Sequence, residues 1–370
     1  MSVSKQRGLI ILAATLVTVI VLLVERFWML SPIEARRGTV PTMPALPTPN
    51  IVVDYVALGD EHFRQGNLDD AITRYREAVQ QNTRVPHVYA RLGQLLLWRG
   101  QADEAATLLE RAIDLDPSTA SNYALLCMAY DWSQRYDEAI ARGLKAIDLD
   151  PSYAPAYGYL GEAYVDAGQV GEAKQMGQKA VALGPDIADV RRAYGYVLQS
   201  TGDYAGAESE YRRAAELQPN VAFFHIALAR FYRTAKQEEM AMSELQKAMA
   251  VEPSNPLSYQ EMGLILYGNK KYEEAASQFE QALAKDSQSE IANRYLAWSY
   301  YLAGKYKLAE PYFEAAAKLD PERAETQAGL GWTLFNLQRY DEARIAFEKA
   351  IALDPNSQSA QEGLKAMQGH

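Results

Sequence analysis

The sequence predicts an all-α protein: an α-solenoid of nine 34-residue helix-turn-helix units over residues 52–357, preceded by one transmembrane helix. Two observations predict the solenoid: prolines recur at intervals of 34 residues, and alanines occupy two fixed positions of every unit. A fixed period of this length is typical of stacked repeat architectures. A charge-free apolar run near the N-terminus predicts the membrane helix.

Proline marks the end of most units. It cannot continue a helix, and it disfavours the helical conformation of the residue before it. Thr83 and Ser287 stand where the series lacks proline. The prolines of the series are Pro117, Pro151, Pro185, Pro219, Pro253, Pro321 and Pro355. Counted back from this series, the units begin at Val52, Pro86, Ala120, Ala154, Ala188, Ala222, Pro256, Glu290 and Ala324.

Small residues at fixed positions allow the helices to approach one another closely. Alanine fills position 20 of every unit, from Ala71 to Ala343, and position 27, from Ala78 to Ala350. Position 8 is always Gly, Ala or Cys. Larger apolar residues at positions 7, 11 and 24 then fill the spaces between helices.

Within a unit, we expect helices at about positions 2–14 and 18–30. Glycine at position 15 suits a left-handed helix end, and aspartate at position 18 suits the start of the second helix by capping and by the helix dipole. The glycines are Gly66, Gly100, Gly168, Gly202 and Gly304, and the aspartates are Asp69, Asp103, Asp137 and Asp341.

The pattern resembles the tetratricopeptide repeat (TPR) family over Val52 to Ser357. In the fourth unit the family's signature positions 4, 7, 8, 11, 20, 24, 27 and 32 read Tyr157, Leu160, Gly161, Tyr164, Ala173, Gly177, Ala180 and Pro185. The sequence departs from the signature at Gly143 and Gly177, where a bulky residue is expected, and at His62; these departures suggest local looseness. The resemblance implies a right-handed superhelix with a concave groove.

The N-terminal region divides into a tail (1–7), a transmembrane signal-anchor (8–30) and a Pro/Thr-rich linker (31–51). Gly8 to Val24 carries no charge over 17 residues, which corresponds to roughly 25 Å of helix. Phe27 and Trp28 follow, as expected for aromatic residues at a membrane interface. The alternative is a cleaved signal peptide, although no Ala-x-Ala cleavage site follows Val24.

The sequence favours an extracytoplasmic repeat region, but by analogy alone. Basic residues on both sides of the apolar run do not separate inside from outside; they are Lys5 and Arg7 before it, and Arg26, Arg36 and Arg37 after it. Four prolines make the linker a semi-extended spacer; they are Pro41, Pro44, Pro47 and Pro49. An anchor followed by such a spacer resembles bacterial surface or periplasm-facing proteins.

We find no pattern typical of catalysis, of a metal site or of a cofactor. The four histidines lack further ligands at metal-binding spacing, and the glycines follow the repeat and form no phosphate loop. Acidic pairs such as Asp69–Asp70 recur at helix starts. The single cysteine, Cys127, excludes an intrachain disulfide, and the net charge of −10 argues against nucleic acid as a partner. The sequence therefore predicts a protein that is not an enzyme.

The TPR resemblance implies that positions 2, 5, 9 and 12 of each first helix face the groove. Large side chains there predict a surface for an extended peptide with apolar and some acidic residues. The candidates are Arg192, Tyr196, Phe223, Arg230, Arg233, Leu264, Tyr267, Arg294, Trp298, Tyr301, Trp332 and Phe335. The alternative is that these side chains pack against the neighbouring first helix.

Residues 358–370 are expected to form a capping helix and a short tail that cover the last unit. The sequence as a whole predicts a membrane-anchored scaffold that binds a peptide or protein segment and supports assembly of a complex. Two alternatives stay open: a cleaved, secreted or periplasmic TPR binding protein, and a recruiting or sensory subunit of an enzyme on a separate chain.

Overall fold

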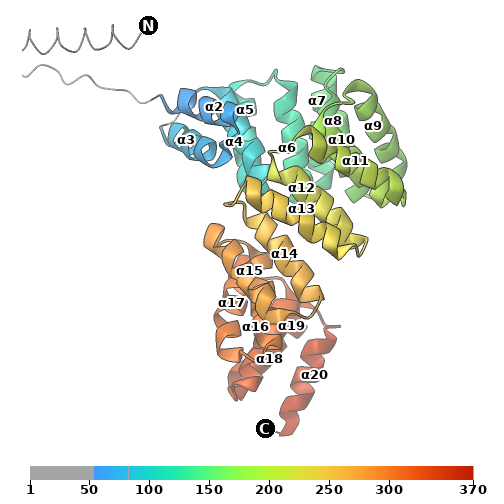
Figure 1. Cartoon of the computed structure of the whole chain (residues 1–370). Coiled ribbons are helices and arrows are strands. Elements are labelled where there is room, and N and C mark those ends of the chain that lie inside the picture. Colours follow the sequence, from blue (N-terminus) through green and yellow to red (C-terminus); the bar gives the residue numbers. More distant parts are fainter. Residues whose placement is uncertain (1–53, 82, 370) are drawn as a thin grey trace, which may run out of the picture. The chain divides into compact units, whose positions relative to one another are not determined.

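The computed structural model describes residues 54–81 and 83–369, which form 19 α-helices, one terminal 3₁₀ turn (Met367–Gly369) and no strand (Figure 1). The predicted tail, signal-anchor and linker (1–51) lie outside the described residues. Among the residues that are described, no helix is both long and apolar enough to cross a membrane. The prediction of an all-α repeat solenoid is confirmed for this part of the chain.

The helices alternate as first and second helices of nine units. The first helices are α2 (Tyr55–Gln65), α4 (Pro86–Leu97), α6 (Ala120–Trp132), α8 (Ala154–Asp166), α10 (Ala188–Ser200), α12 (Ala222–Thr234), α14 (Pro256–Gly268), α16 (Glu290–Leu302) and α18 (Ala324–Asn336). The second helices are α3 (Leu68–Gln80), α5 (Ala102–Leu115), α7 (Tyr136–Leu149), α9 (Val170–Leu183), α11 (Tyr204–Leu217), α13 (Glu238–Val251), α15 (Tyr272–Lys285), α17 (Tyr306–Leu319) and α19 (Tyr340–Leu353).

The second helices begin one residue earlier than expected, and this changes the role of the aspartates at position 18. Asp69 and Asp103 lie inside the first turn of α3 and α5, after the N-cap residues Asn67 and Gln101. The predicted capping role is therefore wrong, although a carboxylate in the first turn still interacts favourably with the helix dipole. Among the second helices, only the N-cap of α11 is shown to accept a side-chain cap bond, from Gly206 N to Asp203.

The turn between the two helices has a left-handed residue at position 15 in all nine described units. The five predicted glycines have φ between 73° and 85°. In the other four units the residue is Gln134, Lys236, Lys270 or Gln338, with φ between 59° and 64°. A residue with a side chain is strained in this conformation, so these four turns store backbone energy.

Replacing the four strained residues by glycine is expected to stabilise the protein. Each of Gln134→Gly, Lys236→Gly, Lys270→Gly and Gln338→Gly should raise the free energy of unfolding by about 0.5–1 kcal/mol, after the entropic cost of glycine is subtracted. Thermal or urea unfolding of the quadruple variant measures the sum.

The matched control for these turns is Gly304→Gln. Gly304 has φ 73° and no atom within 4 Å of an added Cβ, so the change tests backbone strain alone. We expect it to destabilise the protein by a similar amount. Stabilisation by the control, or destabilisation by the four glycines, would contradict this account.

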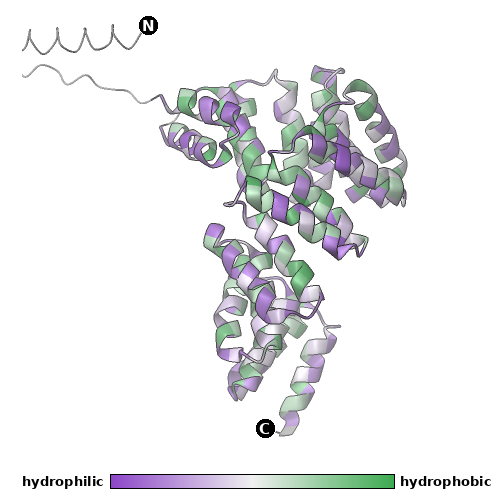
Figure 2. Cartoon of the chain, viewed as in Figure 1, coloured by the Kyte–Doolittle hydropathy of each residue, from purple (hydrophilic) through white to green (hydrophobic). Residues whose placement is uncertain are grey.

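The core lies between helices, and Figure 2 shows hydrophobic residues interspersed with hydrophilic ones along the helices. Ala71 and Ala105 are fully buried, and a Cβ added at Gly59 would lie 2.6 Å from the Tyr75 ring. Position 8 therefore stays small because the side chain at position 24 rests on it. The looseness expected at Gly177 is not found, since the Tyr194 ring of the next unit fills that space.

Units also contact one another beyond their neighbours. Trp98, the C-cap residue of α4, stacks on Phe223 of α12 at 6.0 Å between ring centroids, and it lies 6.1 Å from the Phe224 ring. Asp69 on α3 accepts a hydrogen bond from Ser254 at 2.5 Å and pairs with Arg99. Contacts in the first six units are therefore not limited to neighbouring units, because the end of α4 reaches α12.

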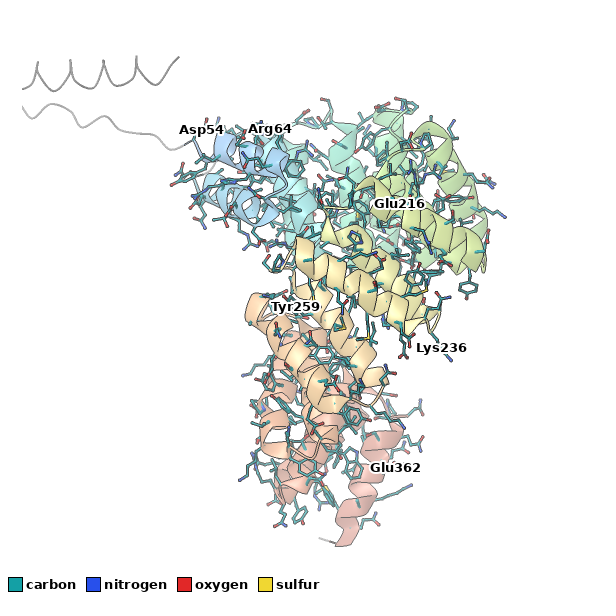
Figure 3. All side chains as sticks on the ribbon, in the orientation of Figure 1. Asp54, Arg64, Glu216, Lys236, Tyr259 and Glu362 are labelled. Atoms are coloured by element: carbon teal, nitrogen blue, oxygen red, sulfur yellow. The ribbon has the colours of Figure 1, made fainter. Side chains whose placement is uncertain are left out.

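The chain after the ninth unit forms α20 (Gln358–Ala366), which packs on α18 and α19. Glu362, labelled in Figure 3, lies on this helix. Ala360 is fully buried and Met367 is 2% exposed, so α20 covers the Phe347 side of the last unit. An uncovered last unit would expose its apolar face, so α20 contributes to the stability of the ninth unit.

Candidate functional site

The first helices of units three to six enclose a pocket of about 460 Å³, here called the groove pocket. Its walls come from α6, α8, α10 and α12, with single contributions from the α6–α7 turn, α7 and α11. It is lined by Asp131, Trp132, Gln134, Tyr136, Glu162, Asp166, Arg192, Tyr196, Gln199, Tyr211, Phe223, Ala227, Arg230, Phe231 and Thr234. A volume of this size can take one or two side chains of a bound segment.

A buried ion pair forms one wall of the groove pocket. Arg192 is 5% exposed and Glu162 is 2% exposed. The Arg192 Nη2 donates to Glu162 Oε2 at 3.0 Å, and Nη1 lies 2.8 Å from Oε1. The guanidinium also lies over the Phe223 ring at 5.1 Å. The two charges neutralise each other within the chain, whereas Arg192 Nε and Glu162 Oε1 are buried without a hydrogen bond.

A second buried carboxylate in the groove pocket has no such partner. Asp131 is 3% exposed, and its Oδ1 accepts no hydrogen bond. Burial raises the pKa of Asp131 to about 8, and the nearby carboxylates of Asp166 and Glu162 contribute in the same direction. Arg192 lowers this pKa, but it is already engaged with Glu162. Asp131 is thus a group whose charge depends on what occupies the pocket.

Asp131→Asn is expected to stabilise the protein increasingly as the pH rises from 4 to 8. The folded-state pKa of Asp131, about 8, lies above the reference value of 3.8, so the folded state binds this proton more tightly. Its contribution to stability is complete below the reference pKa and is lost as the pH rises through about 8. Asparagine carries no such proton, so the variant avoids the loss.

Thermal unfolding at several pH values measures this difference. Asp148→Asn serves as the control, because Asp148 has a side chain that is 73% exposed and pairs only with Lys145. The control should show no gain with rising pH. A gain from Asp131→Asn that is equal at pH 4 and pH 8 would refute the charge assignment.

The structure places four of the twelve predicted residues around the groove pocket: Arg192, Tyr196, Phe223 and Arg230. Tyr196 donates to Asp166 at 2.5 Å, and Phe223 is buried against Trp98. Arg230 and its neighbour Arg233 both pair with Glu261, at 2.6 and 3.2 Å. The middle arginines are therefore already neutralised by the chain's own carboxylates.

The tryptophans predicted in the last three units pack on the second helix of their own unit and on the first helix or capping helix that follows it. Trp298 lies 5.1 Å from the Phe313 ring and 5.5 Å from Tyr301, each nearly perpendicular. Trp332 packs on Phe347 at 5.3 Å, and its indole N–H donates to the Ser359 hydroxyl at 3.0 Å. A Cβ added at Gly329 on α18 would lie 2.9 Å from the Trp298 ring, so Trp298 also contacts the neighbouring first helix, as the packing alternative expects. Partner binding by these side chains stays a prediction.

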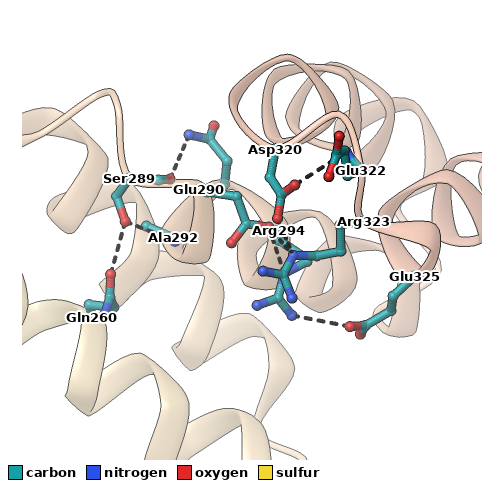
Figure 4. A network of polar contacts seen from close by, with 10 residues as sticks. Gln260, Ser289, Glu290, Ala292, Arg294, Asp320, Glu322, Arg323 and Glu325 are labelled. Carbon is teal, nitrogen blue, oxygen red and sulfur yellow. Dashed lines mark hydrogen bonds and ion pairs between the residues drawn. The ribbon is translucent and has the colours of Figure 1, made fainter. Parts of the chain in front are cut away.

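Arg294 belongs to a network of polar contacts at units seven to nine (Figure 4). It is 7% exposed and donates from Nε to Glu290 at 2.7 Å. Its Nη1 lies 3.5 Å from Glu325, and Arg323 lies 3.4 Å from the same Glu290. The remaining candidates, Leu264, Tyr267, Tyr301 and Phe335, are half-buried and pack in the apolar clusters of these units.

The sequence analysis missed Asp131, Glu162 and Asp166. Glu162 stands at position 9 and Asp131 at position 12, in the same stripe that gave the aromatic candidates. Acidic residues at groove-facing positions of units three and four could therefore have indicated this site. The pairing also follows a rule: Arg192 bonds Glu162, and Tyr196 bonds Asp166, each across 30 residues. Because the repeat is 34 residues long, two residues 30 apart lie on neighbouring first helices, at positions that differ by about one helical turn.

The paired helices and their 34-residue period define an α-helical repeat protein. The chain belongs to the TPR proteins: residues 50–255, more than half of the chain, match the TPR family model described as the cilia and flagella-associated protein 70 C-terminal domain. Residues 261–324 and 297–358 match the model described as tetratricopeptide repeat. No curated protein sequence matches the chain significantly.

Solved structures support the same fold. The chain resembles a chain of the APC/C hetero-tetramer Cut9–Hcn1, with a TM-score of 0.60 and 16% sequence identity. The alignment covers 81% of this chain and 59% of that chain, so this chain spans less than two thirds of its length. Pseudomonas aeruginosa pilF aligns with a TM-score of 0.51 and 24% identity, over 59% of this chain and 98% of its own. A human IFIT1 dimer with m7Gppp-AAAA aligns with a TM-score of 0.55 and 18% identity, over 84% of this chain and 79% of that chain. At these identities the likeness concerns the fold alone.

Proposed function

We propose that the chain is a membrane-anchored, non-catalytic TPR scaffold that holds a segment of a partner protein in the groove pocket and supports assembly of a membrane complex. The observation that carries this proposal is the groove pocket itself, built by four consecutive first helices. TPR proteins generally bind proteins or peptides. The right-handed superhelix implied by the resemblance is part of the same proposal.

The lining of the groove pocket suits a protein segment better than other ligands. Trp132, Tyr196 and Phe223 offer aromatic surface, which supplies much of the affinity at protein interfaces. Asp166, an exposed carboxylate of the lining, adds negative charge, which repels a phosphate backbone. Cys127 is fully buried with a raised thiol pKa, so it is a poor nucleophile and supports a non-catalytic role.

Photo-crosslinking in native membranes tests the groove. A photoreactive phenylalanine analogue at Thr234, an exposed residue that lines the groove pocket, should form a covalent adduct with a partner protein. The matched control is the same analogue at Tyr204, which is 58% exposed at the start of α11 and does not line the pocket. Equal adducts from both positions, or none from Thr234, would refute binding in the groove.

The membrane anchor and the extracytoplasmic position of the repeats belong to the proposal and rest on the sequence of residues 8–51. Deleting Met1 to Leu30 should release the repeat region from the membrane fraction, because each unit buries its apolar faces on other units. Sedimentation of the shortened chain with membranes in high salt would show that the repeats bind lipid themselves.

A further inference from the structure

We propose that the groove pocket takes a basic side chain of the partner segment, an ammonium or guanidinium group that donates its hydrogen bonds to Asp131. This inference rests on the proposed function, since it names the chemistry of the segment that the groove holds. It reverses the acidic preference that the arginines of the groove stripe predict from the sequence.

The first observation is the state of Asp131. Its side chain lines the groove pocket, is 3% exposed, and has a buried Oδ1 without any hydrogen-bond partner. Leaving a buried acceptor unsatisfied costs free energy, more so when the acceptor is ionised. A cationic donor that enters the pocket would satisfy the oxygen and stabilise the ionised form of this carboxyl group.

The second observation is the balance of charge around the groove pocket. Its two arginines are already used: Arg192 pairs with Glu162, and Arg230 pairs with Glu261 outside the pocket. Asp166 is exposed and is bonded only by the neutral hydroxyl of Tyr196. Two carboxylates of the pocket, Asp131 and Asp166, therefore lack a cationic partner, whereas both arginines of the pocket have an anionic partner.

The third observation is the aromatic surface beside these carboxylates. Trp132, Tyr196 and Phe223 line the same pocket and can cover the aliphatic stem of a lysine or arginine. Arg192 already lies over Phe223 in this way. Among the described residues, no group of three His, Cys, Asp or Glu side chains could hold a metal ion, which favours an organic cation.

A peptide-library experiment on the full chain in detergent tests this proposal. The probes are immobilised random dodecapeptides in five sets, each with one central position fixed as Lys, Arg, Ala, Glu or Asp. The Lys and Arg sets should retain about tenfold more protein than the Glu and Asp sets, as expected for charge-assisted hydrogen bonds in a buried site. Asp131→Asn should abolish this preference.

Two controls keep the outcome decisive. Asp131→Asn is expected to be at least as stable as the native protein, so lost preference cannot come from unfolding; Asp148→Asn changes an exposed carboxylate on α7 and should keep the preference. Binding without a basic preference, or a preference that survives Asp131→Asn, overturns this inference but leaves the proposed function standing. No binding to any set overturns both.

Discussion

Phe223→Ala should lower the free energy of unfolding by about 3–5 kcal/mol, the usual cost of removing a buried aromatic ring. Phe223 is 3% exposed and contacts three other aromatic rings, which belong to Trp98, Trp132 and Phe224. Because Trp98 caps α4 and Phe223 lies on α12, the loss should reach the second unit as well as the sixth. Urea unfolding measures the change in the free energy of unfolding, and hydrogen exchange of α4 measures whether the second unit is also destabilised.

A comparison with Phe313→Ala separates local from distant effects. Phe313 is fully buried, but its aromatic contact is Trp298 in the same unit, and it packs against Gly329 of the next. Its removal should affect exchange only in units eight and nine. A double-mutant cycle of Trp98→Ala and Phe223→Ala should also give a coupling energy of about 0.5–1.5 kcal/mol. Unchanged exchange in α4 and zero coupling would mean that these units act independently.

The repeat could be predicted from the sequence because it depends on local rules. Proline spacing located the unit boundaries, and the alanines at positions 20 and 27 located the close helix contacts. In units two to nine, the helix starts observed for α4 to α19 lie within one residue of the expected positions. The left-handed conformation predicted for the glycines at position 15 is also confirmed, and four further units form the same turn with Gln or Lys.

Contacts between distant units could not be predicted in the same way. Whether Trp98 meets Phe223 depends on the small rotation from each unit to the next, summed over four units. No single unit's sequence encodes that sum. The prediction of Arg192 and Arg294 as binding residues considered each position alone, so both arginines appeared free. Arg192 in fact bonds Glu162 on the neighbouring first helix, and Arg294 bonds Glu290 one turn earlier on its own helix. A search for opposite charges 30 residues apart would have found the first pair.

The buried ion pair of the groove leads to the second large effect. Arg192→Met should destabilise the protein by about 3–5 kcal/mol at neutral pH, because it leaves Glu162 buried without its counter-charge. Methionine retains much of the side-chain volume, so the loss reports mainly on charge. The matched control is Arg213→Met, since Arg213 is 45% exposed and pairs with an exposed Asp186. The control should change stability by less than about 1 kcal/mol.

The pH dependence of the Arg192→Met variant gives the stricter test. Burial already raises the pKa of Glu162, and Arg192 is the main group that lowers it. Without Arg192 this pKa should rise further, so the variant's folded state gains relative to the native protein as acid protonates Glu162. The deficit should therefore shrink as the pH falls, and Glu162→Gln in the same chain should remove most of it at every pH. A deficit that stays constant from pH 8 to pH 5, or that Glu162→Gln enlarges, would show that Arg192 stabilises the groove by packing on Phe223 and Trp132 and not through its charge.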